Sequence, residues 1–304
     1  MVQTKQRKLQ KYLILDYKIM GYKRIIRKVA RFVLTEQPSA HVTVKVDSVS
    51  TGSILEGKRI VVTGGGSGIG LAMAKKFVSE GASVIISGRN ENKLKKAVMD
   101  LDSEKALYVV YDVSDVNGCT NYLDHCKELL GGIDCLVSNA GVSFHEGSFE
   151  NVTIDDFDKQ FNINYKGNYF LSKAFLEMKE KETNVEGAQL LLITSETGDI
   201  CYDIPYGMTK AGLNSLVRAL SRRVYKKGIR VNGIAPGVTQ SDMTKDYTEA
   251  SDGNLYMDNA AGRIFLPEEV AEVACFLLSD ASKCISGEII HTNAGNHLKP
   301  HFID

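Results

Sequence analysis

The segment "RIVVTGGGSGIG", Arg59–Gly70, places a short apolar run directly before a glycine-rich turn, and a helical pattern follows it. Glycines at Gly64, Gly68 and Gly70 allow a sharp turn and a close approach of the backbone to a pyrophosphate at the N-terminus of the next helix. A glycine-rich turn alone is a weak signal. Because this one opens a strand–turn–helix unit, it predicts a dinucleotide site rather than a turn without a ligand.

Six further apolar runs follow, and helical patterns separate them. Near-continuous Val, Ile and Leu runs are typical of a parallel sheet covered by helices on both faces, because such strands have no solvent side. The sequence predicts an α/β fold with a doubly wound, seven-stranded parallel Rossmann sheet in a single domain. The expected helices span 70–80, 91–101, 118–130, 154–181, 206–227 and 267–278. The domain is assigned to residues 56–298, between a basic N-terminal extension and linker at 1–55 and a C-terminal tail at 299–304.

The charge distribution sets the N-terminal extension apart from the domain. Residues 1–34 contain ten Lys or Arg and one acid, so the rest of the chain is net negative by nine. Apolar residues recur at helical spacing between the basic ones, which predicts a basic amphipathic helix. It could dock on an anionic membrane surface, on a partner, or on its own domain or a sister subunit. The acidic domain and the lack of a reading motif argue against nucleic acid.

Composition excludes several other classes of protein. No window of the sequence approaches the ~20 apolar residues of a membrane-spanning helix, and no signal peptide is evident, so we expect a cytoplasmic protein. Six cysteines form no C-x-x-C pair and are interpreted as reduced, mostly buried thiols. No cluster has metal-ligand spacing, so no metal is expected. His145, His291 and His297 are interpreted as loop residues.

The end of the second expected strand indicates which dinucleotide binds. An acid there would hold the ribose hydroxyls of the adenosine, but "VIISGRN", Val84–Asn90, contains no carboxylate and offers Arg89. A guanidinium suits a 2′-phosphate because it presents a charged fork of donors. We therefore favour NADPH over NADH, with a merely solvated Arg89 as the alternative. Ser67 stands in the glycine turn where a second basic residue would strengthen this preference. Asp112 and Val113, after the third strand, are expected to meet the adenine.

Tyr206 and Lys210 share one face of an expected helix in "PYGMTKAG", Pro205–Gly212. A neighbouring ammonium stabilises a phenolate, so the spacing predicts that the pKa of Tyr206 is lowered toward neutrality. Such a phenol can exchange a proton with a carbonyl or alcohol oxygen. Tyr-x-x-x-Lys pairs also occur by chance. Here, however, Ser195 ends the strand eleven residues earlier, at the edge where open α/β sheets bind ligands.

Six motifs together resemble one family, the short-chain dehydrogenases/reductases in their compact, single-domain form. They are "TGGGSGIG" (63–70), "SNAG" (138–141), "NINYKG" (162–167), "ITSETG" (193–198), "YGMTK" (206–210) and "IAPGVTQSDM" (234–243). The resemblance covers residues 55–295, and the joint order and spacing of the motifs make it specific.

The resemblance implies a role for each matching residue. Asn164, Ser195, Tyr206 and Lys210 would form a catalytic tetrad. Ser195 would hold the substrate oxygen, Tyr206 would be the general acid or base, and Lys210 would grip the nicotinamide ribose. Asn164 would bind a water that links Lys210 to solvent. The expected cofactor-binding residues are Gly64, Ser67, Gly68, Ile69, Gly70, Arg89, Asp112, Val113, Asn139, Ala140, Gly141, Tyr206, Lys210, Pro236, Gly237, Val238 and Ser241.

Four departures from the family pattern are visible. Ser138 stands where a second Asn is usual, Ser241 where Thr is usual, and "HTNAG", His291–Gly295, where a "VDGG"-like ending is common. The interval from Ser195 to Tyr206 is one or two residues short. The first three departures are mild, and the last puts the shape of the substrate pocket in doubt more than the chemistry.

The sequence therefore predicts an oxidoreductase that transfers hydride between NADPH and a small-molecule carbonyl or secondary alcohol, similar to a 3-oxoacyl-acyl carrier protein reductase. A sugar or polyol dehydrogenase is the alternative within the family. A non-catalytic cofactor-binding sensor or scaffold, recruited by the basic N-terminus, is the alternative from another class. The resemblance also implies a homodimer or homotetramer. Substrate choice is expected to lie in residues 142–151, 196–204 and 240–263, the last of which reads as a lid.

Overall fold

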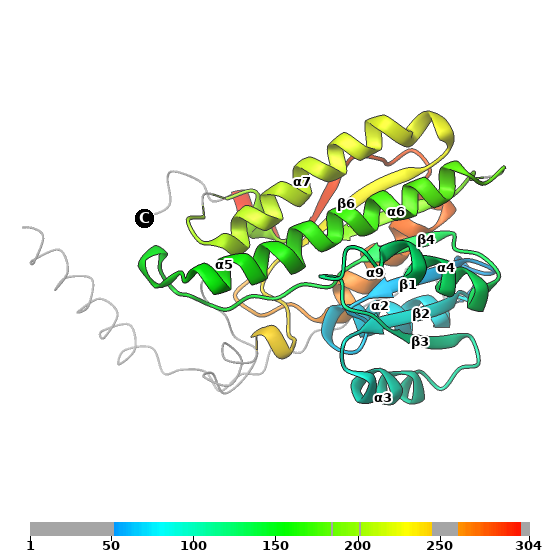
Figure 1. Cartoon of the computed structure of the whole chain (residues 1–304), viewed down its shortest axis with the longest axis horizontal. Coiled ribbons are helices and arrows are strands. Elements are labelled where there is room, and N and C mark those ends of the chain that lie inside the picture. The colour runs from blue at the N-terminus through cyan, green and yellow to red at the C-terminus, as the bar shows by residue number, and fades with distance from the viewer. Residues whose placement is uncertain (1–51, 184, 201, 245–260, 299–304) are drawn as a thin grey trace, which may run out of the picture. The chain divides into compact units, whose positions relative to one another are not determined.

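The computed structural model describes residues 52–183, 185–200, 202–244 and 261–298. Within them the chain forms a seven-stranded, all-parallel sheet with helices on both faces (Figure 1). This confirms the predicted doubly wound α/β fold. The predictions for the basic extension, for most of the lid at 240–263 and for the tail at 299–304 fall outside the described residues. None of the helices that the structure describes is long and apolar enough to cross a membrane.

The order of the strands reverses in the middle of the sheet. The strands are β1 (Arg59–Thr63), β2 (Ser83–Gly88), β3 (Ala106–Val110), β4 (Cys135–Ser138), β5 (Gln189–Ile193), β6 (Arg230–Pro236) and β7 (Ile289–Thr292). They lie side by side in the order β3-β2-β1-β4-β5-β6-β7, so Ile60 of β1 pairs with Val84 on one side and Cys135 on the other. The chain therefore switches direction between β1 and β4. In such sheets ligands bind at the switch point, outside the carboxyl ends of the strands.

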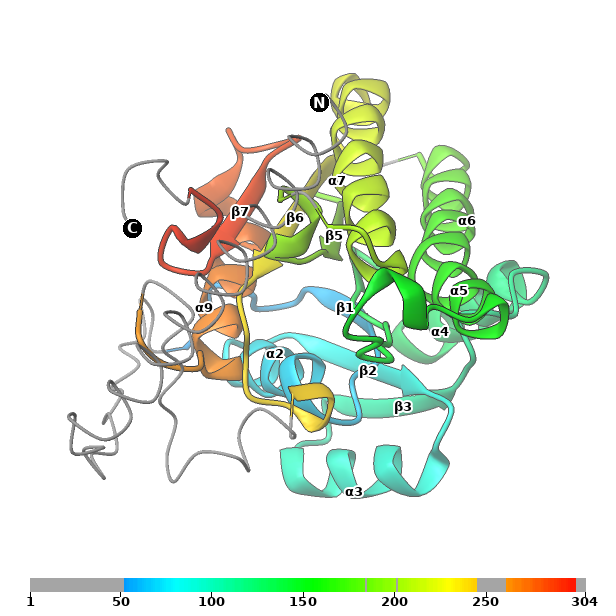
Figure 2. The ribbon, with the colours of Figure 1, turned by 90° about the vertical axis from the view of Figure 1, so that its left-hand side faces the viewer.

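Two layers of helices enclose the sheet. On one face lie α2 (Gly68–Ser79), α3 (Glu91–Leu101) and α9 (Pro267–Leu278), and on the other lie α4 (Cys119–Leu130), α6 (Asn168–Glu180) and α7 (Pro205–Val224), as Figure 2 shows. Alternate residues of a strand pack into the hydrophobic cores on the two faces of the sheet. Ile60 and Val62 pack in the core under α2, whereas Val61 between them packs in the core under α6. Burial on both faces explains why the strands lack polar alternation.

The helix expected at 154–181 is interrupted. It consists of α5 (Ile154–Gln160), a π-helical segment η2 (Phe161–Gly167) and α6. The wider turn coincides with a close backbone approach, because a Cβ on Gly167 would lie 2.3 Å from the carbonyl oxygen of Val113. π-Segments inside helices are frequent at functional sites, and this one carries Asn164. Helical periodicity alone could not reveal it. The helix expected at 206–227 is α7 followed by a 3-10 turn, η4 (Tyr225–Lys227).

The thiols in the described part of the chain are unpaired. Cys119, Cys126, Cys135 and Cys275 are buried, and Cys284 is exposed. Burial raises the pKa of the Cys126, Cys135 and Cys275 thiols to about 12, which keeps them protonated and unreactive. No group of three or more His, Cys, Asp or Glu in the described ranges has a metal-binding arrangement.

Candidate active site

The glycine-rich turn lies against the turn that follows β4. Gly64 has φ +67°, and a Cβ there would lie 2.9 Å from Asn139 Nδ2 and 3.0 Å from Ala140 Cα. A Cβ on Gly70 would lie 2.3 Å from the carbonyl oxygen of Gly64. These positions therefore exclude any side chain. Thr63 joins the two turns, because its Oγ1 accepts bonds from the backbone N–H groups of Asn139 (3.0 Å) and Ala140 (3.1 Å).

The N-terminus of α2 is open to a ligand. Ser67 is the N-cap, but its side chain makes no capping hydrogen bond, and no acidic residue lies in the first turn. Backbone N–H groups at a helix start lack intrahelical partners and favour an anion. The close-packed glycines and this helix end therefore fit the pyrophosphate of a dinucleotide.

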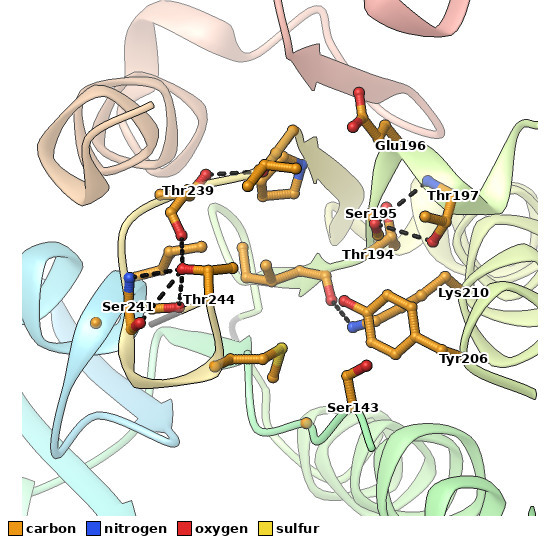
Figure 3. Close-up of a pocket in the computed structure, with 18 of the residues that line it drawn as sticks. Ser143, Thr194, Ser195, Glu196, Thr197, Tyr206, Lys210, Thr239, Ser241 and Thr244 are labelled. Carbon is orange, nitrogen blue, oxygen red and sulfur yellow. Dashed lines mark hydrogen bonds between the residues drawn. The ribbon is translucent and has the colours of Figure 1, made fainter. Parts of the chain in front are cut away.

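One cavity of about 520 Å³ connects this turn to the carboxyl ends of β5 and β6. Most of the predicted site residues line it: Gly64, Ser67, Gly68, Ile69, Gly70, Asn139, Ala140, Gly141, Ser195, Tyr206, Lys210, Pro236, Gly237, Val238 and Ser241. In Figure 3, Ser195, Tyr206 and Lys210 lie on one side of the cavity, and the loop that carries Thr239, Ser241 and Thr244 lies on the other. The cavity therefore has room for a cofactor end and a substrate end.

Ser195 and Tyr206 are brought together by two different elements. Ser195 follows β5 as the N-cap of a short 3-10 turn, η3 (Glu196–Gly198), where its Oγ accepts bonds from the backbone N–H (3.2 Å) and the hydroxyl (3.0 Å) of Thr197. Tyr206 lies in the first turn of α7, after a proline at N1, a position that proline favours. Both residues line the same cavity.

The pKa of Tyr206 differs from the sequence prediction. Burial raises it to about 12, more than the hydrogen bond with Ser195 lowers it. The expectation that Lys210 lowers this pKa toward neutrality is therefore wrong for the arrangement described. The Lys210 ammonium lies 5.4 Å from the centre of the Tyr206 ring and donates instead to the carbonyl oxygen of Ile193 at 3.1 Å. Spacing of i and i+4 places two side chains on one face, but it does not determine burial.

Lys210 is itself strongly perturbed. Its side chain is 4% exposed, and burial lowers its pKa from 10.5 to about 8. An ammonium held at this point by a single carbonyl keeps its other donors for a ligand. This geometry supports a role in gripping a hydroxylated group.

Asn164, the fourth predicted residue, does not line the cavity. Its Oδ1 accepts from the N–H of Val142 at 2.8 Å, and its Nδ2 donates to the Val142 carbonyl at 2.8 Å. It lies just behind Gly141, where a Cβ would be 3.3 Å from Asn164 Oδ1 and 3.6 Å from Lys210 Nζ. Asn164 therefore fixes the cavity wall beside Lys210, and its water-binding role stays a prediction.

Three predicted cofactor residues also lie off the cavity. Arg89 is exposed at the carboxyl end of β2. Asp112 Oδ1 accepts from the N–H (2.9 Å) and hydroxyl (2.7 Å) of Ser114, and Val113 is buried. All three follow β2 or β3, on the adenine side of the switch point. Their contact with a cofactor stays a prediction.

Several pocket residues were not identified from the sequence. Thr244 Oγ1 donates to the carbonyl of Thr239 at 2.6 Å and accepts from the N–H of Ser241 at 3.0 Å, which closes the loop over the cavity. Glu196 and Asn296 line the substrate side. Glu196 lies in the "ITSETG" motif and Thr244 in the stretch 240–263 expected to choose the substrate, but neither residue was given a role of its own, and Asn296 lies outside the motifs. His145, expected to be a loop residue, lines the pocket. His291, also expected in a loop, lies in β7 instead.

Comparisons with known proteins agree with this geometry. The family described as enoyl-(acyl carrier protein) reductase matches residues 64–297. Versicolorin reductase stcU of Emericella nidulans is 32% identical over 79% of this chain and 96% of its own. The 3-oxoacyl-[acyl-carrier-protein] reductase FabG of Aquifex aeolicus is 30% identical over 79% and 98%. A 3alpha-hydroxysteroid dehydrogenase of Mediterraneibacter gnavus is 33% identical over 78% and 96%. These relatives differ in substrate.

Solved structures give the same result. A 3-ketoacyl-(acyl-carrier-protein) reductase of Brucella melitensis, complexed with NADH, superposes with a TM-score of 0.72 at 27% identity, covering 80% of this chain and 99% of the other. The Pseudomonas aeruginosa RhlG/NADP complex gives 0.74 at 27% identity, covering 80% and 97%. One of these proteins was solved with NADH and the other with NADP.

Proposed function

The chain belongs to the short-chain dehydrogenase/reductase family and is an NAD(P)-dependent oxidoreductase acting on CH–OH groups, and from this premise we propose that it is an NADPH-preferring carbonyl reductase. The observation that carries the proposal is the meeting of Ser195, Tyr206 and Lys210 in one cavity with the glycine-rich turn. The nicotinamide, when bound, supplies the hydride.

The side chains would bind the substrate and move the proton. The Ser195 hydroxyl donates to the substrate oxygen and holds it beside Tyr206. The Tyr206 phenol then gives its proton to that oxygen as negative charge develops on it. A phenol with a pKa of about 12 is protonated at neutral pH, so Tyr206 carries the proton that reduction requires. The Lys210 ammonium would hold the nicotinamide ribose, because its remaining donors are unused by Ile193.

The preference for NADPH rests on the carboxyl end of β2. Arg89 is exposed there, and no carboxylate occupies the end of that strand. A 2′-phosphate would gain a charge-assisted bond from the guanidinium, whereas NADH offers no such group.

Fluorescence titration with NADPH and NADH, on the wild type and Arg89→Ala, tests this preference. Arg89→Ala is expected to weaken NADPH binding at least ~10-fold, the equivalent of one charge-assisted bond, and to leave NADH nearly unchanged. Lys96→Ala, a neighbouring exposed cation on α3, is the control. Equal affinity for both nucleotides would contradict the preference, and binding of neither would contradict the reaction.

As substrate we propose a 3-oxoacyl thioester. The FabG relative and the Brucella reductase support this choice. Polar side chains at the substrate side, including Ser143, Thr197 and Glu196, favour a sugar or polyol as the second candidate. Initial rates with NADPH on acetoacetyl-CoA and on a ketose would discriminate, with Tyr206→Phe as the inactive control. A non-catalytic sensor is disfavoured, because all four tetrad residues are present.

We also propose that the chain assembles as a homodimer or homotetramer through the helical segments at 154–181 and 206–227 and the C-terminal strand. Tyr169 and Phe170 of α6 support this, because both aromatic side chains are about 40% exposed on its outer face. Light scattering on the eluted protein is expected to give two or four times 33.4 kDa. A mass of one chain would contradict the proposal.

A further inference from the structure

The loop that carries Ser195 is hydrogen-bonded at both ends to the C-terminal segment, defined as His291–Leu298. At the start of the loop, Glu196 Oε2 accepts from Asn293 Nδ2 at 2.9 Å and from Asn296 Nδ2 at 3.0 Å. At its end, Asp199 Oδ2 lies 2.8 Å from His291 Nε2. Residues almost 100 positions apart therefore meet in three hydrogen bonds beside the catalytic serine.

The segment is folded so that its two asparagines converge. Ala294 has φ +51° and Gly295 has φ +77°, which turns the chain sharply between Asn293 and Asn296. The N–H of Asn296 donates to the carbonyl of Asn293 at 3.0 Å, and Asn293 Oδ1 accepts from the N–H of Gly295 at 3.1 Å. A non-glycine residue rarely adopts this left-handed conformation, so the turn depends on the contacts around it. This turn is the "HTNAG" stretch that departs from the family pattern.

The Ser195 loop, defined as Ser195–Asp199, has little structure of its own. It contains a single 3-10 turn, and such turns have poorer hydrogen-bond geometry than an α-helix. On its other side it rests on α7, where Asn214 Nδ2 donates to Asp199 Oδ2 at 3.0 Å. Gly198 lies so close to this helix that a Cβ would be 2.9 Å from the carbonyl carbon of Lys210. The loop is thus held between α7 and the C-terminal segment.

Glu196 is placed to connect the segment with the catalytic residues. Its side chain is 8% exposed, lines the cavity with Ser195 and Tyr206, and lies beside β7, as Figure 3 shows. A buried carboxylate that accepts two N–H groups makes bonds about twice as strong as neutral ones. Because Glu196 directly follows Ser195 in the chain, movement of one moves the other.

We propose that Glu196 is a positioning residue. Its carboxylate fastens Asn293 and Asn296 to the Ser195 loop and so holds the Ser195 hydroxyl against the Tyr206 phenol. We call the hydrogen bonds of Glu196 with Asn293 and Asn296 the clamp. Asn296 lines the same cavity, so the clamp also fixes one wall of the substrate side. The kinetic part of this inference rests on the proposed reductase function, whereas the structural part does not.

Amide hydrogen exchange on the full chain tests the clamp without a substrate. Glu196→Leu removes both acceptors, and exchange in peptides covering 195–199 and 291–298 is expected to be at least ~10-fold faster. Glu196→Gln keeps an oxygen that accepts from both asparagines and is expected to restore most of the protection. Glu268→Gln, an exposed carboxylate on α9, is the matched control. Should Glu196→Leu fail to fold, Asn296→Ala, which removes one bond from the partner side, decides the question.

Kinetics with NADPH test the positioning role. Glu196→Leu is expected to lower kcat/KM by ~10- to 100-fold, the range for a small misplacement of a catalytic group, and to leave NADPH affinity within ~2-fold. Glu196→Gln keeps the hydrogen bonds and should recover the rate. The pH profile is tested with Asn296→Ala, which loosens the loop but keeps the Glu196 carboxylate, whose charge itself raises the Tyr206 pKa. This profile should move to higher pH, because a looser Ser195 contact removes what lowers the Tyr206 pKa. A purely structural role would reduce folded protein without moving the profile.

The two proposals fail separately. Unchanged exchange in both Glu196→Leu and Asn296→Ala overturns the clamp, whatever the activity. Faster exchange with an unmoved kcat/KM and pH profile overturns the positioning role. If the wild type reduces no carbonyl, the reductase function is contradicted. If loop exchange is nevertheless faster in Glu196→Leu than in the wild type, the clamp is supported.

Discussion

Two lysines are buried almost equally but in different surroundings. One lies where the strands begin, which we call the amino edge of the sheet, and the other where they end, the carboxyl edge. Lys179, at the end of α6 where the strands begin, is 3% exposed and donates to Glu182 at 2.7 Å. Lys210, where the strands end, is 4% exposed and donates to a backbone carbonyl, that of Ile193. Within the part of the chain that the structure describes, no carboxylate forms an ion pair with Lys210.

The amino edge around Lys179 is a network of paired charges. Glu182 also accepts from Lys127 at 2.9 Å, and Arg59 forms a two-bonded pair with Asp134 at 2.7 and 2.9 Å. Pairing offsets the cost of taking a charge out of water. Lys210 lacks such a partner, and burial lowers its pKa to about 8. At the amino edge the buried and partly exposed charges are paired and stabilise the fold, whereas at the carboxyl edge Lys210, unpaired among the described residues, lowers stability and keeps its donors for a ligand.

The largest effect is expected for Tyr206→Phe. Removing the phenol eliminates the proton donor, so kcat should fall by ~10³-fold, while NADPH binding and the unfolding temperature change little. Assays of NADPH oxidation, a nucleotide titration and a thermal unfolding curve measure these three quantities. Retention of more than a tenth of the wild-type kcat would show that Tyr206 is not the acid.

Lys210→Met tests the stability cost of burying an ammonium without a carboxylate partner. The variant should be inactive but more stable than the wild type. The pKa of Lys210 is lower in the folded state than its usual 10.5, so the cost of burial is fully present below about pH 8. The mutant should gain about 3 kcal/mol in the free energy of unfolding at pH 7. This gain should shrink as pH rises from 8 to 10.5, where the unfolded lysine also loses its proton. Urea unfolding at several pH values measures this gain in the free energy of unfolding. A variant less stable than the wild type at pH 7 would show that burial of Lys210 carries no such cost.

Glu182→Gln makes the opposite test at the amino edge. It leaves Lys179 buried without its carboxylate, which should cost about 2–3 kcal/mol of stability and leave kcat unchanged. Glu177→Gln is the control, because its ion pair with Lys173 is more than half exposed and should contribute little. If both variants lose the same stability, the pairing of Lys179 is unimportant and the contrast between the edges disappears.

Local patterns in the sequence were sufficient for the fold and, together with the family resemblance, for most of the predicted residues that line the cavity, whereas Asn164 and the three residues after β2 and β3 lie off it. Seven apolar runs gave the strands, and the motifs at Gly64, Ser195 and Tyr206 come together as expected, because each follows a strand at the same edge. The pKa of Tyr206 was predicted wrongly, since it depends on burial rather than on distance along a helix. The contacts of Glu196 were not predicted at all. Its partners lie 97 and 100 residues away, and hydrogen bonds across that distance leave no periodic signal.

The smallest effect is expected for Asp134→Asn, and its sign depends on pH. Burial alone would raise the pKa of Asp134, but the hydrogen bonds from Arg59 outweigh it and hold the pKa below its usual value. The folded state therefore binds this proton less tightly than the unfolded state, so the pair contributes stability above about pH 4 that is lost as pH falls through the folded pKa. At pH 7 the mutant should be less stable by about 1.5 kcal/mol, the lower end for a bond to a charged group, because the Arg59 side chain is 36% exposed. Urea unfolding at pH 7 and near pH 3 measures this difference, with the exposed Asp100→Asn as control. A deficit that persists unchanged at low pH would mean that Asp134 stabilises the amino edge by packing rather than by charge, and the contrast with Lys210 would then rest on Lys179 alone.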